Sequence, residues 1–222
     1  MAINQEAYTE LMNELKDKNV TVVAVSKTKT AEDIFELYKL GQQDFGENYG
    51  QELLEKYLKL PPDIRWHFIG HLQTNKVKHI VPFVYLIHSV DSYKLLSEIN
   101  RQAQKINRVI NCLLQVHIAQ EETKFGFDEK ELDEIINELT NVPMKNIDIL
   151  GLMGMASFTD DLDKVRGEFK YLKVLFDKFK KSEIRNPKSE ILSMGMSNDY
   201  KIAIEEGSNM VRIGSLLFGE RV

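Results

Sequence analysis

Short apolar runs rich in β-branched residues alternate with longer amphipathic stretches along nearly the whole chain of 222 residues. This alternation is typical of β/α units around a parallel sheet. Strands are predicted at Thr21 to Val25, Asp44 to Phe45, Trp66 to Ile69, Val84 to His88, Val109 to Ile118, Ile147 to Leu152, Ile191 to Met194 and Met210 to Ile213. A helix is predicted over residues 3–18. Eight strands indicate a closed (β/α)8 TIM barrel with an extra N-terminal helix.

An open doubly wound sheet is the competing architecture. Such a sheet usually has about five or six strands, and one that holds a nucleotide carries a glycine fingerprint after its first strand. Here the first predicted strand is followed by Ser26-Lys27-Thr28-Lys29-Thr30, without a glycine. The barrel is therefore favoured, and barrels keep their chemistry at the carboxyl ends of the strands, often with a phosphate after the seventh and eighth.

Composition indicates one domain over residues 1–222, since no Pro/Gly/Ser-rich linker or low-complexity tract divides the chain. The formal net charge of -5 argues against a nucleic-acid-binding face. No apolar segment approaches the roughly 20 residues that span a bilayer, and Met1 to Glu10 lacks the pattern of a signal peptide. The single cysteine, Cys112, is expected to pack in the core and cannot form an internal disulfide. We expect a soluble, cytoplasmic protein.

Lys27 stands just past the first predicted strand, so a barrel would present its amine at the mouth. A lysine amine is a poor nucleophile at its free pKa of about 10.4, and it suits Schiff-base formation when desolvation or a nearby cation lowers that value. Taken alone, with Lys29 two positions on, a lysine that begins a solvated loop is the simpler interpretation.

Two glycine-containing turns near the carboxyl terminus supply the second signal. After the seventh predicted strand, Gly195 lets the backbone come close, and Ser197 is predicted to cap a helix over Tyr200 to Glu206. After the eighth, Gly214 and Ser215 can aim amides and a hydroxyl at an anion. Each turn alone is commonly structural, but the two together follow the strands where barrels hold phosphate.

Six blocks of the sequence carry a family resemblance, in the family's order and spacing. They are Ala24-Val25-Ser26-Lys27-Thr28-Lys29, Phe45-Gly46-Glu47-Asn48-Tyr49, Trp66 to Lys76, Gly151-Leu152-Met153, Leu192 to Ser197, and Val211 to Ser215 with Phe218 to Arg221. Together they resemble the YggS/PROSC family of pyridoxal phosphate homeostasis proteins, whose fold is similar to the barrel domain of bacterial alanine racemase. The stretches around His117, Ala119 and Gly154 depart from the family's usual sequence, so no role is carried over to them.

The resemblance implies that the cofactor is pyridoxal 5'-phosphate. By the matching positions, Lys27 would form the Schiff base, and the phosphate would be held by Ser197, Gly214 and Ser215. Asn48 and Arg212 would lie close to the cofactor ring, and His67 is a further candidate for a cofactor contact.

Three of these residues have a structural alternative. His67 could instead hydrogen-bond within the barrel, and Asn48 could cap a helix that begins at Tyr49. Arg212 could form an ion pair with Glu206 or Glu220 instead of donating to the pyridine nitrogen. A guanidinium stays protonated in proteins, so at the ring it would keep that nitrogen unprotonated and the ring a weak electron sink.

The favoured function is a non-catalytic protein that buffers or carries pyridoxal phosphate, has no catalytic residue, and exchanges the cofactor with dependent apoenzymes. The alternative is an amino-acid racemase, but two-base racemisation needs an acid opposite the lysine, and no residue stands out for that role. The sequence also ends soon after the last barrel elements, so we expect no covering β domain and a monomer. A Schiff-base aldolase or sugar-phosphate barrel would differ by being colourless.

A metal site is not predicted. His71, His79, His88 and His117 show no spacing that would assemble one with Cys112. The methionines at 153, 155, 194 and 196 are expected to pack the barrel rim.

Overall fold

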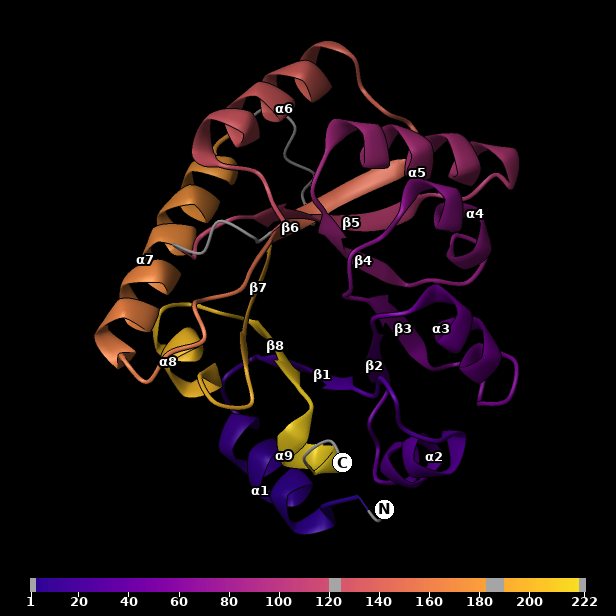
Figure 1. The fold of residues 1–222 in the computed structure, drawn as a ribbon, viewed down its shortest axis with the longest axis vertical. Coiled ribbons are helices and arrows are strands. Elements are labelled where there is room, and N and C mark those ends of the chain that lie inside the picture. Colours follow the sequence, from indigo (N-terminus) through magenta and orange to yellow (C-terminus); the bar gives the residue numbers. More distant parts are fainter. Residues whose placement is uncertain (1–2, 120–124, 183–189, 220–222) are drawn as a thin grey trace.

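The computed structural model describes residues 3–119, 125–182 and 190–219. Eight parallel strands form a closed barrel in chain order, and the last strand pairs with the first (Figure 1). The strands are β1 (Thr21–Val25), β2 (Asp44–Glu47), β3 (Arg65–Phe68), β4 (Leu86–Val90), β5 (Ile110–Val116), β6 (Ile147–Gly154), β7 (Ile191–Met196) and β8 (Met210–Ile213). The predicted (β/α)8 barrel is confirmed.

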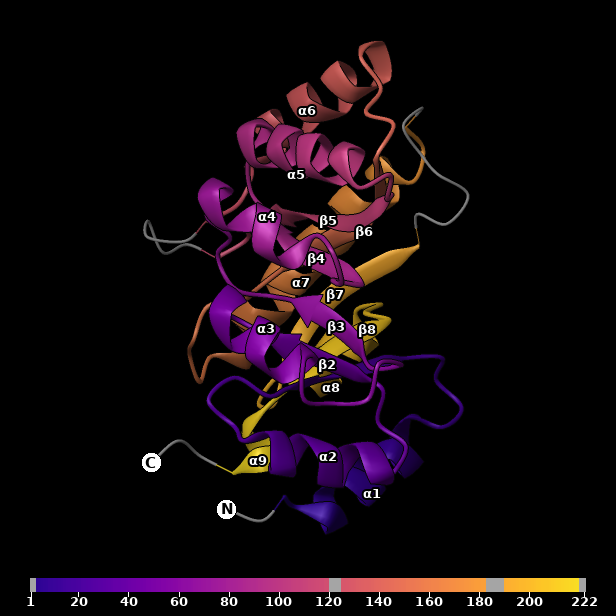
Figure 2. The ribbon, with the colours of Figure 1, turned by 90° about the vertical axis from the view of Figure 1, so that its right-hand side faces the viewer.

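Helices surround the sheet on its outer face (Figures 1 and 2). They are α1 (Gln5–Leu15), α2 (Ala31–Lys39), α3 (Gly50–Tyr57), α4 (Val77–Ile80), α5 (Tyr93–Lys105), α6 (Glu129–Asn141), α7 (Leu162–Phe179), α8 (Tyr200–Glu205) and α9 (Ser215–Phe218), with a 3-10 turn η1 (Thr74–Lys76). The extra N-terminal helix α1 lies beside α9, where the Asn4 amide donates to the Leu217 carbonyl at 2.8 Å.

Local sequence explains where the helices begin. The Thr30 side chain accepts from the Asp33 amide while the Asp33 side chain accepts from the Thr30 amide, a capping box that starts α2 directly after the Lys27 turn. Asn4 caps α1 by accepting from the Ala7 amide, which places the helix start within the predicted range.

The apolar core has two layers, because successive strand residues point alternately inward and outward. The inner layer fills the barrel with Val23, Leu86, Leu113, Leu150, Met153 and Met210. The outer layer packs between the sheet and the helices and includes Phe45, Trp66 and Cys112, so the predicted core position of Cys112 is confirmed. Because side chains fill the barrel, a ligand site is expected at the end of the barrel and not along its axis.

The predicted strand ends differ from the structure mostly by one or two residues, and β4 shows why. The sequence pattern starts this strand at Val84, but the Val84 amide donates to the Ile80 carbonyl in the turn that ends α4. β4 therefore starts at Leu86 and runs on to Val90. In the described part of the chain, none of the helices has both the length and the apolar character needed to cross a bilayer.

Candidate functional site

A cavity of about 830 Å³ opens at the carboxyl ends of β1, β6, β7 and β8. This volume suits a small organic ligand or cofactor. Its walls include five of the seven predicted site residues, Lys27, Ser197, Arg212, Gly214 and Ser215. Asn48 and His67 are not among the residues that line it. The structure thus brings together side chains that stand almost 190 positions apart in the sequence.

Lys27 occupies a tight turn that leaves β1. The Ser26 carbonyl accepts from the Lys29 amide at 3.0 Å, which closes the turn around Lys27 and Thr28. Thr28 has φ 65°, a left-handed conformation that a β-branched residue rarely adopts. The turn directs the Lys27 side chain to the cavity wall, as the sequence predicts.

The turns after β7 and β8 are joined by a hydrogen bond. The Ser197 hydroxyl accepts from the Gly214 amide at 3.1 Å. The predicted N-cap role of Ser197 is therefore wrong: α8 begins at Tyr200, its N-cap position is Asp199, and that side chain makes no capping bond. The residues between Ser197 and the helix form an extra turn, and Ser197 is left at the cavity wall.

A bulge in β7 sets the direction of this turn. The pairing of β7 with β8 shifts register between Ser193 and Met196, around Gly195, which has φ 95°. A Cβ on Gly195 would lie 2.6 Å from the Ala203 Cβ of α8, so only glycine permits this backbone and the close approach of the helix.

Arg212 is a buried guanidinium on β8 that also reaches the cavity. Its Nη1 donates to the Ser193 carbonyl at 2.9 Å and to the Ser193 hydroxyl at 2.8 Å, and its Nη2 donates to the Gly154 carbonyl at 3.0 Å. Burial lowers the pKa of Arg212 to about 10, against the opposing effect of Asp199, so the group stays cationic at neutral pH.

The alternative of an ion pair for Arg212 is wrong for Glu206, which instead pairs with Arg166 at 2.5 Å. Glu220 lies outside the described residues.

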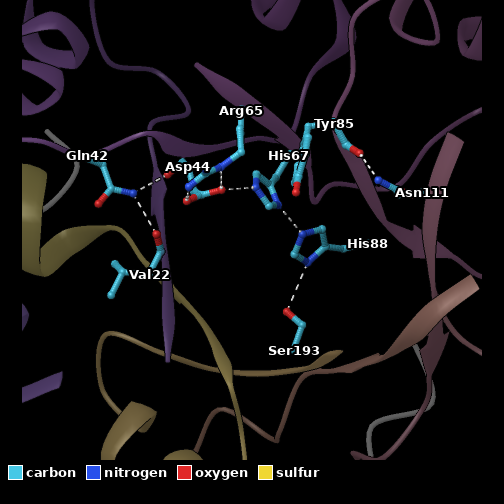
Figure 3. Close-up of polar contacts among 9 residues, drawn as sticks. All are labelled: Val22, Gln42, Asp44, Arg65, His67, Tyr85, His88, Asn111 and Ser193. Atoms are coloured by element: carbon cyan, nitrogen blue, oxygen red, sulfur yellow. Dashed lines mark hydrogen bonds and ion pairs between the residues drawn. The ribbon is translucent and has the colours of Figure 1, made fainter. Parts of the chain in front are cut away.

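A hydrogen-bonded chain of side chains runs through the barrel interior from Asp44 to Ser193 (Figure 3). Ser193 in turn bonds to Arg212. At the amino end of β2, Asp44 binds Arg65 through both oxygens and contacts His67 Nε2 at 3.0 Å. His67 Nδ1 lies 2.9 Å from His88 Nε2, and His88 Nδ1 lies 3.1 Å from the Ser193 hydroxyl. Both ring nitrogens of His67 therefore bond within the barrel, as its structural alternative predicts.

The charge on Asp44 fixes the direction of the first bond in that chain. Burial acts to raise the pKa of Asp44, but hydrogen bonds from Arg65 and His67 outweigh it and lower the pKa. His67 must then donate through Nε2 to the carboxylate.

His88 continues the chain towards Arg212. It is completely buried, and desolvation, with repulsion from His67 and Arg212, places its pKa well below 6.5. A neutral His88 donates from one ring nitrogen and accepts at the other, and the Ser193 hydroxyl that it contacts also accepts from Arg212. The chain thereby connects an ionised carboxylate at one end of the barrel to a guanidinium at the other.

The Asn48 amide follows β2 and carries an unusual feature. Its Oδ1 is buried and has no hydrogen-bond partner among the described residues. The capping alternative is wrong, because α3 begins at Gly50 after an N-cap at Tyr49 that has no side-chain bond. A buried acceptor without a partner is costly, and a polar ligand or a water would relieve it.

Two remaining expectations concern metals and methionines. In the described part of the chain, no three His, Cys, Asp or Glu side chains come together in an arrangement that could hold a metal ion. Met153 and Met194 are buried, as expected for packing, whereas Met196 is 37% exposed and lines the cavity.

Sequence reasoning missed Asp44, His88 and Ser193, the polar members of the interior chain. A signal was present for His88 and Ser193, because each is a polar residue that interrupts an apolar strand. Asp44 opens the short strand β2, where only its contact with His67 marks it. It also missed Lys56, whose spacing of four from Glu52 on α3 is typical of an exposed helix pair, although Lys56 is buried.

The sequence is similar to known proteins along almost its whole length. Residues 3–222 match the model of the alanine racemase N-terminal domain family. The chain is 43% identical over 201 residues to the pyridoxal phosphate homeostasis protein of Aquifex aeolicus, covering 90% of this chain and 86% of that one. It is 39% identical over 228 residues to the protein of that name from Homo sapiens, covering 98% and 82%.

Solved structures agree with the sequence matches. PipY of Synechococcus elongatus, solved with pyridoxal phosphate bound, superposes with a TM-score of 0.87 at 32% identity and covers 96% of this chain and 99% of that one. Alanine racemase of Bartonella henselae shares the fold, with a TM-score of 0.69 at 16% identity over 95% of this chain and 56% of that one. By these matches, this chain belongs to the family of pyridoxal phosphate homeostasis proteins, within the wider alanine racemase N-terminal domain family.

Proposed function

We propose that this chain binds pyridoxal 5'-phosphate in the cavity at the barrel mouth, with Lys27 as its covalent anchor. The observation that carries the proposal is the convergence on one cavity of a lysine amine, a buried guanidinium and two turns that present amides and hydroxyls. An aldehyde, a pyridine ring and a phosphate are the matching parts of that cofactor. PipY, a relative that holds the same cofactor, supports the assignment.

Different residues of the site suit different parts of pyridoxal 5'-phosphate. Ser197, Gly214 and Ser215 would hold the phosphate, since amides and hydroxyls of this kind are common anion ligands. Arg212 would face the pyridine nitrogen, and its Nε and one Nη2 hydrogen have no protein acceptor among the described residues. Asn48 does not line the cavity, and its proposed contact with the ring rests on the family resemblance and on its buried Oδ1, which has no partner among the described residues.

The role we propose is storage and carriage of the cofactor without catalysis, as the name of the relatives suggests. When bound, the cofactor supplies an electron sink to an attached amine, but a cationic Arg212 at the ring nitrogen would keep that sink weak. In addition, no Tyr, His or Cys is among the residues that line the described cavity, so the usual second base of a racemase is missing there.

A Lys27→Ala variant tests the anchor. Wild-type protein mixed with pyridoxal phosphate should turn yellow, and borohydride reduction followed by peptide mapping should find the cofactor on Lys27. Lys27→Ala should stay colourless, whereas Lys39→Ala, which removes an exposed lysine of α2, should behave as wild type. Undiminished colour in Lys27→Ala, or a reduced adduct on another side chain, would disprove the assignment.

The racemase alternative is tested by activity. Protein loaded with the cofactor should racemise or deaminate amino acids far more slowly than typical enzymes, which turn over at least about once per second. A rate in the enzymatic range for any amino acid would replace the carrier function with catalysis.

A protein that carries the cofactor should also be able to hand it to an enzyme that needs it. Loaded protein incubated with an apoenzyme that depends on pyridoxal phosphate should restore that enzyme's activity. We further propose that the protein works as a monomer, which light scattering of the loaded and unloaded forms would measure.

A further inference from the structure

A second lysine, Lys56, lies buried behind the Lys27 turn and outside the cavity. It extends from α3 and has only 7% of its side chain exposed. Its ammonium group donates to Glu47 Oε1 at 2.7 Å, to Glu52 Oε1 at 2.7 Å and to the Ser26 carbonyl at 2.8 Å. All three of its N–H donors therefore have acceptors.

This cluster binds the residues on both sides of Lys27. Before Lys27, the Ser26 carbonyl accepts from Lys56, and the Ser26 hydroxyl donates to Glu47 Oε1 at 2.6 Å. After Lys27, the Thr28 amide donates to Glu52 Oε1 at 2.5 Å. Lys27 is thus the middle residue of a segment whose two neighbours are both held by the same group of charges.

The turn requires such support. Thr28 has φ 65°, whereas glycine or asparagine would adopt this conformation at little cost. Strained residues of this kind persist where the surrounding structure determines the conformation. The bond from Thr28 to Glu52 and the two bonds at Ser26 supply that constraint here.

The charges explain why Lys56 is the key member. Burial raises the pKa of Glu47, and the Lys56 ammonium opposes this by attraction and by hydrogen bonding. Lys56 also bridges Glu47 to Glu52, so it brings together the two carboxylates that hold Ser26 and Thr28. Without it, the carboxylates would repel each other and the Ser26 carbonyl would lose a partner.

We propose that Lys56, acting with Glu47 and Glu52, is a positioning residue for Lys27, and that it holds the strained turn so that the Lys27 amine is aimed at the aldehyde of the cofactor. This inference rests on the proposed function. In the step that it serves, the unprotonated Nζ of Lys27 attacks the aldehyde carbon, a C=N bond replaces the C=O bond, and the oxygen leaves as water. The phosphate turns follow other strands, and the hydrogen bonds of the cluster named above do not include Ser197, Gly214 or Ser215.

The experiment compares two ligands. Pyridoxal 5'-phosphate can react with Lys27, whereas pyridoxine 5'-phosphate carries an alcohol in place of the aldehyde and can only bind. The rate of Schiff-base formation is followed by absorbance in stopped flow, and the affinity of the alcohol by calorimetry. Lys56→Met, which keeps the apolar stem, is compared with Lys59→Met, which changes an exposed lysine close by.

In Lys56→Met, the rate constant for Schiff-base formation should fall on the order of tenfold or more, since small misplacement of a reacting group has effects of this size. The affinity for the alcohol should stay within about twofold, because Lys56 makes none of its hydrogen bonds to the residues that would hold the phosphate. Lys59→Met should match wild type in both measurements. Equal loss of rate and of alcohol affinity, or no loss of either, would overturn the positioning role.

A second pair of variants covers the case in which Lys56→Met does not fold. Glu52→Ala removes the acceptor of the Thr28 amide from a partly exposed place on α3, and Glu55→Ala is its control on the exposed face of the same helix. Glu52→Ala should slow Schiff-base formation severalfold with unchanged alcohol affinity, and a wild-type rate in this variant would refute the inference. Wild-type protein that bound neither ligand would refute the proposed function itself.

Discussion

Single residues in the barrel interior link the protein's acid stability to its candidate site. His88 contacts His67 through Nε2 and the Ser193 hydroxyl through Nδ1. Its low pKa follows from burial and from the nearby His67 and Arg212. The Ser193 hydroxyl that His88 contacts also accepts from Arg212 at the cavity, so the titration of His88 is coupled to the candidate site.

The pH dependence of stability should report on His88. In the unfolded chain His88 takes up a proton near pH 6.5, whereas in the folded chain its pKa is well below that value. The unfolded state therefore binds more protons as the pH falls, and the free energy of unfolding is largest above pH 6.5 and decreases below it. One pH unit below the free histidine pKa of about 6.5, His88 should lower the free energy of unfolding by on the order of 1 kcal/mol.

Urea denaturation at a series of pH values measures this slope. His88→Gln should reduce the dependence of the free energy of unfolding on pH between about pH 7 and pH 5. This range lies around the pKa of a free histidine, about 6.5. His79→Gln, at an exposed position, should retain the wild-type slope. An unchanged slope in His88→Gln would show that another group causes the acid sensitivity.

The single thiol provides an independent test of the core. Cys112 is fully buried in β5, and burial raises the pKa of its thiol, which disfavours the reactive thiolate. The folded protein should therefore resist a disulfide reagent that titrates one thiol per chain after unfolding. Rapid labelling without denaturant would contradict this packing.

At the level of elements, two glycines should respond in opposite ways to substitution by alanine. Gly195 shapes the β7 bulge with a left-handed backbone and touches α8. Gly167 lies on the exposed face of α7, where a Cβ added to it would have no neighbouring atom within 4 Å. Alanine should therefore be tolerated in the helix and not in the bulge.

Gly195→Ala should destabilise the fold by about 1–3 kcal/mol or more, because both strain and overlap with Ala203 oppose it. Gly167→Ala should stabilise by about 0.5–1 kcal/mol through helix propensity. Thermal or urea unfolding measures both. Equal effects of the two substitutions would contradict the account of the bulge.

The strands were predictable because their apolar runs are local patterns. Thr21–Val25 and Met210–Ile213 have the predicted bounds. The turn chemistry was not predictable, since Ser197 precedes a helix as a cap would, but its hydroxyl accepts from Gly214 in the turn after β8. Likewise, the sequence marks Lys56 as a helix-surface residue, and only the packing of α3 on the Lys27 turn buries it.

At the level of the whole molecule, ligand binding should stabilise the closed barrel. The cavity is lined by residues at and just after the carboxyl ends of β1, β6, β7 and β8, so a ligand that fills it binds only the folded state. Pyridoxal phosphate at 100 times its dissociation constant should add about 2.7 kcal/mol to the free energy of unfolding. For a chain of this size the melting temperature should rise by roughly 5–10 °C.

Differential scanning calorimetry with and without the cofactor measures this shift. Lys27→Ala should show a smaller shift than wild type, since only the phosphate and ring contacts remain. An identical shift in both proteins would mean that the covalent bond contributes nothing to retention.

The pairing of β8 with β1 also has a consequence for synthesis on the ribosome. Lys27 emerges more than 180 residues before Arg212, Gly214 and Ser215, so a nascent chain exposes its amine long before the rest of the pocket exists. Chains arrested between these positions would carry Lys27 without Arg212 or the turn after β8, and they could not retain the vitamin. Cofactor loading would thus be restricted to molecules whose synthesis has passed Ser215.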